Sequence, residues 1–125
     1  MMKAAALYNF WSGFGLPAYE ENAVPTGEDK PEYPYLTYSV VEDSFGGETA
    51  MAASLWYRST SWLEAERKTE EISKAIGGGG RILSCGGGAI WLKRGQPFAQ
   101  SMGDDADDMI KRKYINITAE YFTAD

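Results

Sequence analysis

Two glycine-rich stretches have residue types that could bind a nucleotide. A phosphate-binding loop needs Lys and then Ser or Thr directly after its last glycine, but Gly80 is followed by Arg81 and Ile82. Residues 13–18 match the dinucleotide fingerprint GxGxxA, yet they follow a predicted helix instead of a strand, and Pro17 occupies the turn. Both stretches therefore predict turns, and no cofactor is expected.

A cluster of carboxylates could in principle hold a divalent cation, because hard cations bind oxygen ligands. The cluster consists of Asp104, Asp105, Asp107 and Asp108. The calcium-loop pattern fails here, since no glycine stands at the required turn position and no glutamate closes the loop. These residues predict a solvated acidic turn over residues 103–108 and no metal site.

Composition limits the remaining chemistry. The 125 residues include no histidine and one cysteine, Cys85, so the commonest general base is missing and the thiol has no imidazole to activate it. The net charge of −6 argues against sequence-independent binding to the phosphates of nucleic acid. Residues 111–113 are too few to form a basic patch. We predict a non-enzymatic protein, although a small ligand-binding or enzymatic α+β domain that uses Asp and Glu stays an alternative.

The first half of the chain predicts a helix, a loop and a strand pair. Apolar residues recur every three or four positions at the N-terminus: Ala4, Leu7, Tyr8, Trp11 and Phe14. Residues 18–34 contain three prolines and little periodicity, which predicts an extended loop. Alternation from residue 35 predicts a strand, and residues 49–57, after a Gly-Gly turn, predict its hairpin partner.

The second half predicts a helix followed by a meander of strands. Ser61 and Glu64 form a capping-box pattern before a stripe that runs from Trp62 to Ile76, and Gly77 supplies the C-terminal cap. Apolar runs at 81–85, 89–94, 97–102 and 115–121 then predict strands. The sequence therefore predicts one α+β domain over residues 1–125, with a mainly antiparallel sheet and two helices packed on one face.

Aromatic residues suggest a role in contacts between proteins. They gather at Tyr33 and Tyr35, near Phe45 and at residues 56–57, and are numerous for a chain of this size. Exposed aromatics often anchor protein interfaces, although all of them could equally fill the core. No stretch is apolar for long enough to span a membrane, and no signal-peptide pattern opens the chain, so a cytoplasmic origin is expected.

The order of these elements resembles the tail-terminator, or tail-completion, proteins of long-tailed bacteriophages, including minor capsid and head-tail joining proteins. The resemblance runs from the N-terminal helix through residues 33–38 to the final strand at 114–117, and it covers nearly the whole chain. It implies a structural protein of the virion, made in the bacterial host cytoplasm and placed at the tail-head junction. A related tail-tube or connector component is the alternative within this class.

The resemblance also implies partners. A homo-oligomeric ring, usually of six copies, would cap the tail tube protein, meet the head-tail connector protein and let DNA pass without specific binding. An acidic wall would repel the DNA phosphates. Residues expected at the subunit interface or the lumen are Glu28, Asp29, Tyr33, Tyr35, Phe45, Asp104, Asp105, Asp107 and Asp108.

Overall fold

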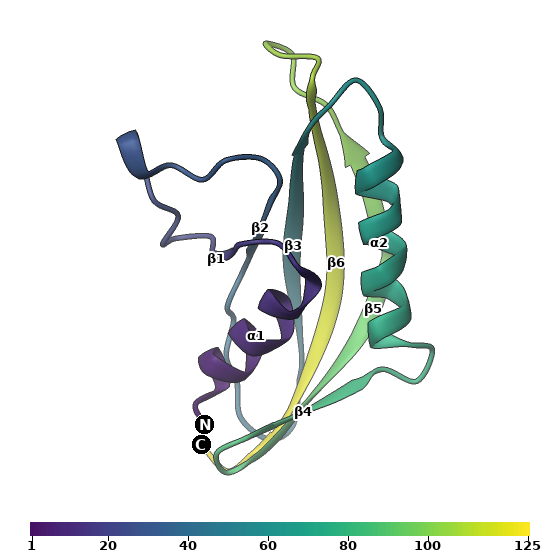
Figure 1. The fold of residues 1–125 in the computed structure, drawn as a ribbon. Coiled ribbons are helices and arrows are strands. Elements are labelled where there is room, and N and C mark those ends of the chain that lie inside the picture. The colour runs from purple at the N-terminus through teal and green to yellow at the C-terminus, as the bar shows by residue number, and fades with distance from the viewer.

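The computed structural model describes all 125 residues as two helices that lie on one face of a six-stranded sheet (Figure 1). The elements in chain order are α1 (Lys3–Trp11), η1 (Ser12–Phe14), β1 (Ala18–Glu20), η2 (Gly27–Asp29), β2 (Tyr35–Tyr38), β3 (Glu48–Arg58), α2 (Leu63–Ile76), β4 (Arg81–Cys85), β5 (Gly88–Met102) and β6 (Ile110–Thr123). The predicted α+β class is confirmed.

The sheet has the strand order β1-β2-β3-β6-β5-β4. All neighbouring strands are antiparallel except β1 and β2, which run parallel. The predicted hairpin of β2 and β3 is confirmed, and the runs predicted at 89–94 and 97–102 form one strand, β5, with an irregularity between Arg94 and Ala99. The helices are too short or too polar to cross a membrane.

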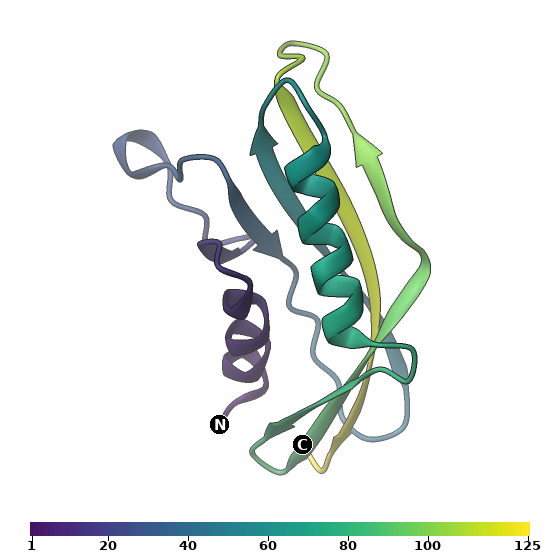
Figure 2. The same cartoon turned by 45° about the vertical axis from the view of Figure 1, so that its right-hand side comes forward.

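Residues 18–34 differ from the predicted extended loop. Their first three residues form β1, because Ala18 pairs with Leu36 and Glu20 pairs with Tyr38 across the intervening chain. The segment also contains the short helical turn η2. In both ribbon views the part between β1 and β2, residues 21–34, stands away from the body of the protein, and we call it the projecting loop (Figures 1 and 2).

The core lies between the two helices and one face of the sheet. Alternate residues of β6, from Lys113 to Thr123, are buried, while the residues between them are only partly covered. From the helices come Leu7 and Trp11 of α1 and Ile72 of α2, each at most 1% exposed. Twenty buried hydrophobic residues form this single cluster, which leaves the opposite face of the sheet without a covering layer.

The stripe predicted for α1 is partly wrong. Tyr8 is 49% exposed, whereas Ala6 and Phe10 are buried. The helix contacts both edge strands, β1 and β4, because the sheet curls around it, and the Arg81 guanidinium lies over the Phe10 ring. The buried arc of α1 is therefore rotated relative to the arc that spacing alone predicts.

The predicted helix α2 is confirmed, but its capping box is not. The Ser61 hydroxyl accepts a hydrogen bond from the Leu63 amide (3.1 Å), while the Glu64 carboxylate pairs with Arg67 instead of reaching back to the cap. At the other end Gly77 has a φ of 78° and donates its amide to the Ser73 carbonyl oxygen (2.9 Å). This positive φ explains the glycine that ends the helix.

Candidate interaction site on the open sheet face

The uncovered face of the sheet carries a strip of aromatic side chains across three strands. The register aligns Tyr35 of β2, Trp56 of β3 and Arg112 of β6 as consecutive cross-strand neighbours. The Tyr35 and Trp56 rings stack with an interplanar angle of 13° and centroids 6.0 Å apart. Tyr33, whose ring centroid lies 5.4 Å from that of Tyr35, extends the strip towards the projecting loop. Two of the predicted interface residues thus lie together here.

Arg112 lies over this strip. Its guanidinium carbon is 4.5 Å from the centroid of Trp56 and 5.4 Å from that of Tyr114, within the range of cation–π attraction. Its Nε donates to the Ser54 hydroxyl (3.1 Å), and the Trp56 indole donates to the Thr37 hydroxyl (2.9 Å). No carboxylate pairs with Arg112, so its positive charge is not neutralised within the chain.

These residues line a shallow hollow of about 210 Å³, and Glu21 and Val24 of the projecting loop form part of its border. Burial is the main cause that raises the pKa of Tyr35; the neighbouring Tyr33 adds to it, and the Arg112 charge opposes it. The hollow therefore presents phenol and indole groups beside the Arg112 cation, with the Glu21 carboxylate at its border. Such a surface suits a planar or anionic group of another protein chain.

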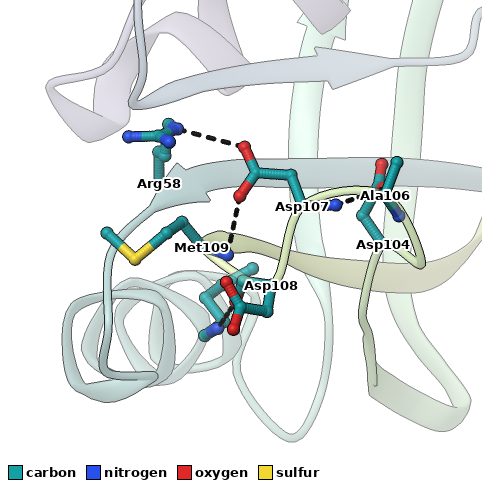
Figure 3. A network of polar contacts seen from close by, with 7 residues as sticks. Arg58, Asp104, Ala106, Asp107, Asp108 and Met109 are labelled. Carbon is teal, nitrogen blue, oxygen red and sulfur yellow. Dashed lines mark hydrogen bonds and ion pairs between the residues drawn. The ribbon is translucent and has the colours of Figure 1, made fainter.

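The acidic turn, residues 103–108, is stabilised by contacts of its own carboxylates (Figure 3). An Asp104 carboxylate oxygen accepts the amides of Ala106 (2.8 Å) and Asp107 (3.2 Å). The Asp107 carboxylate accepts the Met109 amide (2.9 Å) and pairs with Arg58 (3.2 Å). The hydrogen bond from the Met109 amide has the largest effect in lowering the pKa of Asp107, and the contact with Arg58 lowers it further. In this way Asp104 and Asp107 stabilise the turn between β5 and β6.

The other predicted residues lie elsewhere. Asp105 and Asp108 belong to the same turn, and neither carboxylate makes an ion pair or a hydrogen bond. Glu28 and Asp29 lie in the projecting loop, within η2. Phe45 is 71% exposed and packs edge-on against Phe122, with ring centroids 5.5 Å apart. The structure thus spreads the predicted residues over the strip, the loop, the turn and this separate aromatic pair.

Arg112 is the residue that sequence reasoning missed. In the sequence it belongs with its neighbours to one short basic run, although alternation along β6 sends them to different faces. Lys113 is 6% exposed on the core face, where it pairs with Glu66 of α2, while Arg112 lies on the open face. The period-two pattern of residues 115–121, extended by three residues towards the N-terminus, could have separated the two roles.

The fold is similar to that of a chain in a solved structure described as the virion of native gene transfer agent (GTA) particle. The TM-score is 0.62 with 20% sequence identity, and the match covers 94% of this chain and 92% of that chain. At this identity the match shows a shared fold. No family model matches the sequence, and neither does any curated protein.

Proposed function

We propose that this chain is a structural virion protein that forms a ring on the tail tube and joins it to the head connector. The observation that carries the proposal is the similarity in fold, over nearly the full length of both chains, to a chain of a virion particle. The order of elements that resembles tail terminators adds the particular place at the tail-head junction. The ring would contain six copies, and DNA would pass through it without being held.

The open sheet face supports an assembly role. A sheet normally buries one face and can leave the other in water, but this outer face carries stacked aromatics and a cation with no carboxylate partner. Aromatic residues and arginine dominate the energetics of protein interfaces. We assign the strip of Tyr35, Trp56 and Arg112 to contact with a neighbouring virion protein, either the tube or the connector.

The hollows favour assembly over acid–base catalysis. Catalysis by carboxylates needs two such groups that converge on one site. The five main hollows hold at most one carboxylate each: Glu21 borders two of them and the other three have none.

Deletion of the gene tests the proposed position in the virion. Loss of a tail terminator should give overlong or headless tails under the electron microscope, because nothing stops the tube from growing. Loss of a tube protein should give no tails at all. Particles of normal tail length that still carry heads would contradict the proposal.

The double variant Trp56→Ala/Arg112→Ala tests the open face. It removes the strip without touching the buried face, so the purified protein should stay folded while incorporation into particles falls. Arg67→Ala is the matched control, because it removes a side chain that is 66% exposed on α2. Incorporation of the double variant at the control level would exclude the strip as an interface.

A further inference from the structure

The net charge of this protein comes from one segment. Residues 20–43 contain seven acidic residues and one basic residue, a net charge of −6, while the rest of the chain holds eleven of each sign and is neutral. Within this segment Glu28, Asp29 and Glu32 lie on the loop that stands away from the body (Figures 1 and 2). None of these three carboxylates makes an ion pair or a hydrogen bond within the chain.

A hollow of about 550 Å³ lies at the opposite end of the strand order. It is formed where the irregular part of β5 passes the C-terminal end of α2, and its lining includes Ser73, Gly78, Gly79, Trp91 and Arg94. The exposed Arg94 guanidinium donates to the Ser73 hydroxyl (3.0 Å) and has no carboxylate partner. No carboxylate lines the hollow.

The other charged groups near this hollow are lysines, so none of them neutralises the charge of Arg94. Lys93, which also lines it, is already paired with Glu48 (2.5 Å) and Glu120 (3.2 Å) on the open face. Lys74 in the last turn of α2 makes no ion pair. The guanidinium of Arg94 thus has no carboxylate partner, and beside its bond to Ser73 it keeps further N–H donors in the fork geometry that binds a carboxylate with two hydrogen bonds.

We infer that the projecting loop of one copy binds the Arg94 hollow of the next copy, with Glu28 and Asp29 as the carboxylates that meet the guanidinium. The occupant is a second copy of this chain, because the chain itself carries both the free acidic loop and the free cation. The inference rests on the proposed function and adds the surfaces that join ring neighbours.

The positions of the two surfaces determine the kind of assembly. The loop leaves the sheet at the β1–β2 edge, whereas the hollow lies beside β5 and α2 towards the β4 edge. Different faces of neighbouring copies therefore meet, and such heterologous contacts continue from copy to copy and form a ring when the rotation between copies closes. The Arg112 hollow is a poorer receiver, because it is bordered by the loop of its own chain at Glu21 and Val24.

Disulfide trapping tests the contact directly. In a Cys85→Ser background, Thr26→Cys and Gly79→Cys are combined in one chain. Thr26 is exposed directly before η2, so both carboxylates stay in place, and a Cβ added at Gly79 meets no atom within 4 Å. Mild oxidation should give a ladder of dimers, trimers and higher species, because every copy carries one donor and one receiver cysteine. The matched control replaces Gly79→Cys by Arg67→Cys on the exposed surface of α2. A ladder no stronger than that of the control would overturn the inference, and a product that stops at the dimer would overturn the head-to-tail arrangement.

Charge exchange separates a direct contact from misfolding. Arg94→Glu and Glu28→Lys/Asp29→Lys, each added to the trapping chain, should lose the ladder, and an equimolar mixture of the two should regain it. In that mixture each variant loop faces a hollow of opposite charge. Variants that keep the ladder singly, or that fail to regain it together, would contradict the pairing.

If the ladder forms but the protein is absent from virions, the contact stands and the virion role fails. If the ladder is absent but the protein enters virions normally, the contact fails and the virion role stands.

Discussion

Tyr121→Phe should change how the stability of the fold depends on pH above 10. Tyr121 is fully buried, and its hydroxyl donates to the Val41 carbonyl oxygen (2.5 Å). Burial first, and then the negative charge of Glu42, raise the pKa of Tyr121 from 10.0 to about 12. The folded protein therefore keeps this phenol neutral at pH values where the unfolded chain has already ionised it.

The direction and size of the effect follow from this difference in pKa. The contribution of the neutral phenol is fully present below pH 10 and is lost as the pH rises from 10 to about 12. Two pKa units correspond to a loss of about 3 kcal/mol in the free energy of unfolding. Phenylalanine cannot ionise. At pH 8, Tyr121→Phe should lower the free energy of unfolding by about 1 kcal/mol through the lost hydrogen bond. At pH 11.5 the variant should be more stable than the wild type.

Urea unfolding at pH 8, 10 and 11.5 measures the effect. The free energy of unfolding should fall more steeply with pH for the wild type than for Tyr121→Phe; a slope remains in the variant because burial also raises the pKa of Tyr38 and Tyr57. Tyr8→Phe, which alters a side chain that is 49% exposed, is the control. Parallel loss of stability in the wild type and Tyr121→Phe across this range would refute the reasoning.

Three further substitutions test the packing and the turns. Ile72→Ala empties a fully buried site beneath α2 and should cost about 2 to 5 kcal/mol in chemical denaturation. Gly88→Ala should lower the melting temperature sharply, because its Cβ would overlap the Phe122 carbonyl oxygen, whereas Gly79→Ala meets no atom and should leave it unchanged. Asp104→Ala should cost about 1 kcal/mol in urea unfolding by freeing two amides, while Asp105→Ala should cost almost nothing.

The sequence by itself determined the local elements with the clearest periodicity. Alternation identified β2 and β6, the Gly-Gly turn and the aromatic ending identified β3, and helical spacing with a terminal glycine identified α2. These patterns are visible in one dimension because a strand repeats every two residues and a helix every 3.6. Together with the short connections between strands, they were enough to predict the fold class and the hairpin of β2 and β3.

Tertiary structure alone decided the features that depend on residues far apart in the chain. Three features arise from contacts between elements: the parallel pairing of β1 with β2, the rotated buried arc of α1, and the strip of Tyr35, Trp56 and Arg112. Spacing gives the face of a residue but not its neighbour on the next strand, which register and sheet curvature determine. The aspartates, glycines and aromatics are therefore evident in the sequence, but their division into turn caps, interface surface and core was decided by packing.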